Sequence, residues 1–393
     1  MGAFGFLSTS DTVIPGNNGL RDQQLALKWV QDNIELFGGN PQKVTIMGQS
    51  AGAAAVTYQM LNQNSDGLYR AAIGQSGSFL NTWAYTSSTK DTAFELGREL
   101  NFTGNTSEDL KKFLKIQSAV DIKIAATHVY SNNAVKGFLP SIEIDHVDAF
   151  VTQPMYEQLV EGRINKNIPV IMGTTSEEMI AKLIGGIDVF KTTLKDYDDD
   201  LSGLVYRNMH LNDSKVKTIV GREIRSIYTN GTFENHIQEG VKYFTDSYFS
   251  KAVMRFAELY SKYSDVYFYK FSYSGPLGHN PSPKLPGIGK VMHSEDNYYL
   301  WVTNGDDADI FNYSERDIAT SNKYVDMFTY FTKNLIPWEA GNKNLSWPKL
   351  SCESFTFLDI DEILTVKENP RGPAYKKWVE LYEKWAVKPL DSF

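Results

Sequence analysis

The chain has 393 residues and a net charge of -8, and 42% of its residues are hydrophobic while 22% are charged. This composition is that of a globular protein and excludes a largely disordered chain. The negative charge and the absence of a long basic run argue against a nucleic-acid partner, and no stretch reaches the ~20 apolar residues of a membrane span.

Six Asn-x-Ser/Thr sequences occur in the chain, where about two would be expected by chance from ordinary residue usage. They predict N-glycosylation and a secreted, extracellular protein, although residues 1–7 lack the charged region and cleavage site of a signal peptide. The single Cys352 has no second cysteine in the chain to pair with. The predicted glycosylation sites are Asn101, Asn105, Asn212, Asn230, Asn312 and Asn344.

Strand and helix patterns alternate along the first half of the chain, which predicts a mostly parallel sheet with helices on both faces, an α/β fold. No repeat or Pro-rich linker divides the chain, so we predict one domain over residues 1–393. The predicted strands cover residues 44–47, 71–73, 169–173 and 266–271.

Apolar residues at helical spacing predict a helix over residues 20–37, ended by Gly38-Gly39, and another over residues 51–61. A third helix is predicted over residues 247–262, inside one of the long insertions between the later strands. We expect these insertions to cover the edge of the sheet at which the strands end and to determine substrate selectivity. The apolar face of the third helix contains Phe249, Val253, Phe256 and Tyr260.

The segment Gly48-Gln49-Ser50-Ala51-Gly52 matches the pattern Gly-x-Ser-x-Gly, which a chain of this length contains by chance with a probability of about one in ten. Its position between a predicted strand and a predicted helix makes the match specific. The turn is tight, and we expect glycine at 48 and 52 to permit the close approach of neighbouring segments. The helix N-terminus would place the N–H of Ala51 beside a developing oxyanion. Ser50 is therefore the predicted nucleophile.

A serine nucleophile requires a histidine base and a carboxylate that orients it, and in this kind of fold the acid precedes the histidine in the chain. Glu177 and Glu178 directly follow the third predicted strand. His279 and His293 lie in the loop after the fourth strand. Among the six histidines His293 stands out because that loop is rich in glycine, and His279 is its best rival by position. Position alone does not choose between Glu177 and Glu178.

Several segments in order make the chain similar to the type-B carboxylesterase and cholinesterase family over essentially its whole length. Residues 2–7 resemble the family's strand before the nucleophile turn. Residues 17–23, 29–30 and 37–41 resemble its following helix and approach loop. The resemblance implies an α/β-hydrolase fold and a structural role in ion pairs for Arg21 and Asp22.

The resemblance also chooses among the candidates for the triad. Residues 173–178 are similar to the family's acid loop, whose second acidic residue corresponds to Glu178. Residues 292–296 are similar to the catalytic histidine loop, which implies His293. Ser76 corresponds to a buried serine that supports the acid. Met179 departs from the glycine that usually follows the acid and adds bulk beside the triad.

Gln49 narrows the subfamily that the chain resembles. Most relatives have Glu before the nucleophile, whereas a Gln at this position resembles insect juvenile hormone esterases and some insect antennal esterases. A neutral amide removes negative potential from the reacting centre, so cationic alcohols lose attraction and neutral lipophilic esters are favoured. Lys290 stands near His293 where hormone esterases tend to have Gly. A general insect carboxylesterase is therefore an equal expectation.

The resemblance implies a small-molecule ester substrate and neither a metal nor an organic cofactor. It also implies that the chain corresponds to the C-terminal portion of the domain, without roughly a hundred or more preceding residues that include a Gly-rich oxyanion loop. Two alternatives to a working esterase are a truncated, catalytically impaired fragment and a non-catalytic, cholinesterase-like interaction protein.

Overall fold

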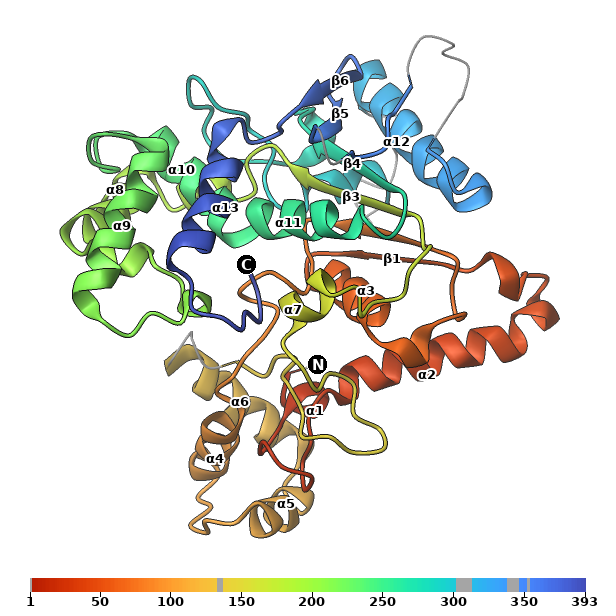
Figure 1. Ribbon diagram of the computed structural model, residues 1–393, viewed down its shortest axis with the longest axis vertical. Helices are drawn as coiled ribbons and strands as arrows, with labels where there is room; N and C mark the ends of the chain where they lie inside the picture. The colour runs from red at the N-terminus through yellow and green to blue at the C-terminus, as the bar shows by residue number, and fades with distance from the viewer. Residues whose placement is uncertain (1, 133–136, 302–312, 338–345, 352–353) are drawn as a thin grey trace. The chain divides into compact units, whose positions relative to one another are not determined.

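The computed structural model describes residues 2–132, 137–301, 313–337, 346–351 and 354–393 (Figure 1). Asn312, Asn344 and Cys352 lie outside these ranges, and the other four predicted glycosylation sites are exposed. The chain forms two compact units, and the prediction of one domain over residues 1–393 stays a prediction. The first unit comprises Met1–Pro41, Tyr58–Leu68 and Trp83–Asn165, and the second Gln42–Thr57, Tyr69–Thr82 and Lys166–Phe393.

The second unit is built on a six-stranded sheet in the order β1-β2-β3-β4-β5-β6. All neighbouring pairs are parallel except the last, in which β6 runs antiparallel to β5. The four predicted strands are confirmed, with ends shifted by at most two residues, whereas β5 and β6 were not predicted. The strands are β1 (Thr45–Gln49), β2 (Ala71–Gln75), β3 (Val170–Thr175), β4 (Val266–Phe271), β5 (Thr356–Ile360) and β6 (Thr365–Glu368).

The strands form where short apolar runs can be buried on both faces, as a parallel sheet requires. β2 and β3 are buried at every residue, while β1, at the edge of the sheet, is half-buried throughout. Alternate residues of β4, which include Tyr269 and Phe271, pack in one core cluster with Phe328 and Phe331 of helix α12. This cluster fixes the register of β4, because a one-residue slip would turn its aromatic rings to the other face.

Most helices of the second unit follow β3, and α8, α9 and α10 gather together in Figure 1. The helix predicted over residues 247–262 is a π-helical turn, Asp246–Ser250, followed by α11, which contacts β3 and β4. The helices are α8 (Ile187–Asp199), α9 (Ser214–Tyr228), α10 (Ile237–Thr245), α11 (Lys251–Tyr260), α12 (Glu315–Asn334) and α13 (Pro373–Trp385). The predicted helix over residues 51–61 is confirmed as α3 (Ala51–Leu61), which begins in this unit.

Lys251, at the start of α11, is fully buried among aromatic rings. Its Nζ atom donates a hydrogen bond to Tyr382 Oη at 3.2 Å and lies 4.8 to 5.9 Å from the ring centroids of Tyr206, Trp378, Tyr382 and Phe393. The ring faces favour the ammonium ion, but desolvation opposes it more strongly. Burial lowers the pKa of Lys251 to about 7, while Asp246 opposes that shift.

We expect Lys251→Met to stabilise the protein most at low pH. Above pH 7 the folded protein has released a proton that the unfolded chain keeps up to its ordinary pKa of 10.5. Between pH 7 and pH 10.5, the free energy of unfolding of the unsubstituted protein should therefore rise by about 3–5 kcal/mol relative to that of the variant. Urea unfolding of both proteins at pH 6, 8 and 10 measures this difference. A difference independent of pH would show that Lys251 does not titrate in this range.

The first unit is helical, and its core joins Ala3 to Leu96, Leu110 and Leu114. The expectation of a strand over residues 2–7 is wrong, because Gly2–Phe6 forms helix α1, whose Ala3 packs into this helical cluster. The helix predicted over residues 20–37 is α2 followed by a 3-10 turn, Ile34–Phe37, which Gly38 ends at φ 79°. The α-helices are α1 (Gly2–Phe6), α2 (Asn18–Asn33), α4 (Thr89–Glu99), α5 (Ser107–Lys115), α6 (Ala119–Asn132) and α7 (Met155–Val160).

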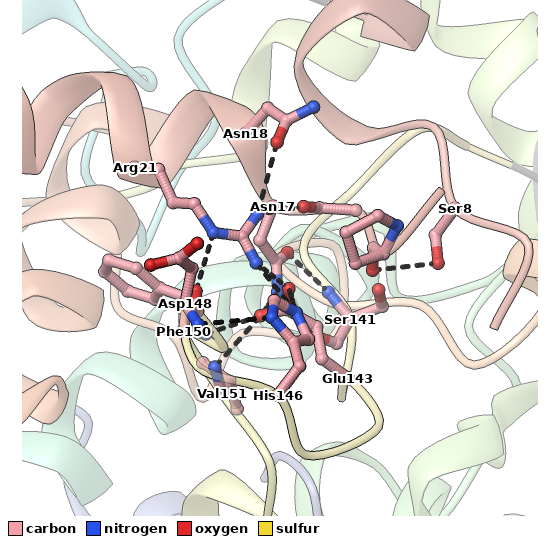
Figure 2. A network of polar contacts seen from close by, with 12 residues as sticks. Ser8, Asn17, Asn18, Arg21, Ser141, Glu143, His146, Asp148, Phe150 and Val151 are labelled. Atoms are coloured by element: carbon pink, nitrogen blue, oxygen red, sulfur yellow. Dashed lines mark hydrogen bonds and ion pairs between the residues drawn. The ribbon is translucent and has the colours of Figure 1, made fainter. Parts of the chain in front are cut away.

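The predicted structural role of Arg21 is visible in the first unit (Figure 2). Arg21 forms an ion pair with Glu143, whose side chain is fully buried. Glu143 also accepts hydrogen bonds from Asn17 Nδ2 at 2.9 Å and from the N–H of Phe150 at 2.7 Å. These partners satisfy the carboxylate, so the network holds the start of α2 to the 141–151 segment.

Within the described ranges, none of the helices combines the length and the apolar composition that crossing a bilayer requires.

Candidate active site

The turn between β1 and α3 places Ser50 in a left-handed backbone conformation with φ at 56°. Its N–H donates to the carbonyl oxygen of Gln75 on β2 at 2.8 Å. The expected need for glycine is confirmed at position 48, where a Cβ atom would lie 2.3 Å from the backbone of Gly52. It is wrong at position 52, where a Cβ atom would meet nothing within 4 Å. Gly77 is the second glycine that the turn requires, since its Cβ atom would lie 2.3 Å from the Ser50 carbonyl oxygen.

The structure brings Ser50, His293 and Glu178 together in one hydrogen-bonded row. His293 Nε2 lies 2.8 Å from Ser50 Oγ, and His293 Nδ1 lies 2.7 Å from Glu178 Oε2. The three side chains follow β1, β4 and β3, which end at the same edge of the sheet because these strands are parallel. With Nδ1–H bonded to the carboxylate, Nε2 is the ring nitrogen that can accept the serine proton.

Glu178 is fully buried, and its second carboxylate oxygen is held by the protein. Oε1 accepts hydrogen bonds from Ser76 Oγ at 2.6 Å and from the N–H of Thr175 at 2.8 Å. The backbone adds a further link, because the Glu178 carbonyl oxygen accepts from the N–H of His293 at 3.0 Å. Ser76 thus lies where the resemblance implied, against the acid.

The two rival residues lie elsewhere in the second unit. Glu177 is buried beside Arg371, with 3.8 Å between Glu177 Oε2 and the guanidinium; burial raises the pKa of Glu177, and Arg371 opposes that shift. His279 lies 3.0 Å from the Tyr313 hydroxyl through its Nε2 atom. Of the two pairs left open by chain position, Glu178 and His293 are the members in contact with each other.

Gln49 reaches across the turn to the histidine loop. Its Nε2 atom donates to Ser294 Oγ at 2.8 Å and lies 3.3 Å from His293 Nε2. The amide therefore adds no charge beside the histidine, as the sequence suggested. Ala51 opens α3, and the first N–H groups of a helix have no acceptor within that helix. An oxyanion formed on a substrate bonded to Ser50 would lie near the N–H of Ala51.

Two neighbours of the triad were not predicted. Asp296 is fully buried, and burial raises the pKa of its carboxyl group. It accepts hydrogen bonds from Gln75 Nε2 at 2.9 Å and from the hydroxyls of Tyr269 and Tyr324 at 3.0 Å. Phe249 stacks on the imidazole of His293, with 4.2 Å between ring centroids. Its place in an apolar helical face was the only signal that the sequence offered for it.

A carboxylesterase family model matches residues 1–378 of the chain. Esterase-5A of Drosophila pseudoobscura pseudoobscura is 31% identical over 356 residues, which cover 84% of this chain and 63% of that protein. Juvenile hormone esterase of Heliothis virescens is 28% identical over 410 residues, which cover all of this chain and 70% of that protein. The chain thus spans less than two thirds of the length of Esterase-5A.

The crystal structure of juvenile hormone esterase from Manduca sexta superposes on this chain with a TM-score of 0.82 at 24% sequence identity. The match covers 97% of this chain and 73% of that one. This likeness, together with the mostly parallel sheet, confirms the predicted α/β-hydrolase fold.

Proposed function

This chain belongs to the carboxylesterase family, and on that premise we propose that it hydrolyses carboxylic esters through an acyl-enzyme intermediate on Ser50. The row of hydrogen bonds from Ser50 through His293 to the buried Glu178 is the observation that carries the proposal. It supplies a nucleophile, a base within reach of its proton and a charge that orients the base.

In the first step Ser50 Oγ attacks the ester carbonyl carbon while His293 Nε2 takes the serine proton. Glu178 keeps the other ring proton on Nδ1 and stabilises the imidazolium. The N–H of Ala51 donates to the negative oxygen of the tetrahedral intermediate. His293 then returns the proton to the leaving alcohol, and the acyl group remains on Ser50.

In the second step water attacks the acyl-serine carbonyl while His293 Nε2 takes a proton from the water. Collapse of the tetrahedral intermediate releases the acid and returns the proton to Ser50. Both steps therefore use the same geometry, and in each of them His293 acts first as a base and then as an acid. Neither step calls on a metal or an organic cofactor.

The preferred substrates are neutral, lipophilic esters. Gln49 presents an uncharged amide 3.3 Å from His293 Nε2, where a carboxylate would attract a cationic alcohol. The similarity to juvenile hormone esterase of Heliothis virescens and to Esterase-5A supports an ester as the substrate. The exposed sequons at Asn101, Asn105, Asn212 and Asn230 support an extracellular glycoprotein.

Turnover of a neutral ester and of a choline ester of equal acyl length tests both the activity and the preference. The protein should hydrolyse p-nitrophenyl butyrate readily and butyrylthiocholine poorly. Gln49→Glu should raise the relative rate on the choline ester, because it restores negative potential. The Ser294 hydroxyl, which accepts a hydrogen bond from the Gln49 amide, can donate one to the new carboxylate. Gln49→Met is the matched neutral control. An unchanged ratio in the Glu variant would show that position 49 does not determine selectivity.

A non-catalytic interaction protein of the same fold is the alternative. Such a protein has no need of a base at 2.8 Å from a serine hydroxyl or of a buried carboxylate behind that base. It would release no p-nitrophenol in the assay above.

A further inference from the structure

An aromatic ring that has no part in the two chemical steps covers one face of the catalytic imidazole. The rings of Phe249 and His293 are stacked, with 4.2 Å between centroids and 30° between planes. Phe249 is only 8% exposed, so it has little room to turn away. The hydrogen bonds to Ser50 and Glu178 hold the imidazole at its edges. Phe249 restrains the motion that those two bonds leave free, which is tilting of the ring out of their common plane.

The ring of Phe249 is presented by the π-helical turn Asp246–Ser250, which separates α10 from α11. A π-turn adds a residue to the helical turn and so changes the direction in which its side chains point. Two sets of side-chain bonds hold this turn. Asp246 accepts from Arg371 Nε at 2.5 Å and from the Tyr228 hydroxyl at 2.8 Å. Asn81 Nδ2 donates to the carbonyl oxygen of Phe249 at 3.2 Å.

Two further hydrogen bonds tie the turn to the loop that carries the catalytic acid. Arg371 donates through Nη1 to the carbonyl oxygen of Ser176, two residues before Glu178, at 2.9 Å. The N–H of Met179 donates to Thr245 Oγ1, at the end of α10, at 3.3 Å. The segments that carry the Glu178 carboxylate and the Phe249 ring, which flank His293, are therefore hydrogen-bonded to each other and to Arg371.

We propose that Phe249 is a positioning residue for His293. Its ring keeps the imidazole in the plane between Ser50 and Glu178, and its π face favours the imidazolium that forms when Ser50 attacks. This inference rests on the proposed esterase function, because it assigns Phe249 a part in that reaction.

Phe249→Leu should lower kcat for p-nitrophenyl butyrate by about 10- to 100-fold, the scale expected when a catalytic group is displaced by up to 1 Å. KM should change much less, because the ring acts on the chemical step and not on substrate binding. Phe249→Tyr keeps the stacked ring and should keep kcat close to that of the unsubstituted protein. Phe244→Leu is the matched control, since it makes the same change at a buried ring that packs on Phe190, Tyr243 and Tyr248.

A spectroscopic measurement tests the stacking without relying on catalysis. In protein with ¹³C-labelled histidine, the ring current of Phe249 should shift the His293 ring protons upfield, with the signal assigned from a His293→Asn variant. The shift should be lost in Phe249→Leu and kept in Phe249→Tyr and Phe244→Leu. A kcat in Phe249→Leu equal to that in Phe244→Leu, or an unmoved His293 signal, would overturn the inference. Absence of ester hydrolysis in the unsubstituted protein would instead overturn the proposed function, and the resonance test would still report on the stacking.

Discussion

Replacement of Ser50 by Ala should lower the turnover of a p-nitrophenyl ester by on the order of a million-fold, the scale seen when the nucleophile of a serine triad is removed. Without the hydroxyl, His293 has no proton to take and no acyl-enzyme can form. The change itself should leave the fold intact, because alanine fits the left-handed turn no worse than serine and removes only the Oγ atom.

Steady-state assays at matched concentrations of folded protein measure this loss. Ser261→Ala is a suitable control, since Ser261 Oγ donates to the Glu258 carbonyl oxygen at the end of α11, at 2.8 Å. The control should keep its activity. Retention of more than a small fraction of the activity by Ser50→Ala would mean that another group is the nucleophile.

Replacement of Glu178 by Gln should lower kcat by about a thousand- to ten-thousand-fold. Ser76 Oγ and the N–H of Thr175 both donate to Oε1 of the carboxylate, so the amide oxygen of a glutamine would take that position. The amide NH₂ would then face His293 Nδ1. This arrangement forces the ring proton onto Nε2, which can no longer accept the proton of Ser50.

Glu177→Gln is the matched control, because it makes the same chemical change one residue earlier. Glu177 lies beside Arg371 and not beside His293, so kcat should fall far less once the loss of folded protein is taken into account. Thermal unfolding of both variants provides that correction. The reverse ranking of the two variants would mean that the acid of the triad is Glu177.

Much of the sheet and of the candidate site could be predicted from the sequence because both depend on short local patterns. Apolar runs mark the strands β1 to β4. The Gly-x-Ser-x-Gly pattern marks the turn around Ser50, and the structure supplies the steric reason for the glycine at position 48. The order of serine, acid and histidine along the chain follows from the order of the parallel strands. Chain position could not separate Glu177 from Glu178, since the choice depends on side-chain directions in one irregular loop.

Other features depend on tertiary contacts that no local pattern reveals. The apolar run at residues 2–7 suits a helix as well as a strand, and its packing against other helices decides the outcome. Strands β5 and β6 contain charged residues such as Asp359 and Lys367, which pair with each other at 2.5 Å at the border of the sheet. Phe249 was assigned to a regular helical face, whereas the π-turn changes the register and directs it to His293.

The central claim is that Ser50 is a nucleophile activated by His293. Reaction with an organophosphate, followed by peptide mass mapping, tests this claim most directly, because these reagents react far faster with an activated serine than with an ordinary one. We expect one adduct per chain, located on Ser50, and no adduct in the Ser50→Ala or His293→Asn variants. An adduct on a different serine, or labelling of Ser50 that persists without His293, would contradict the account.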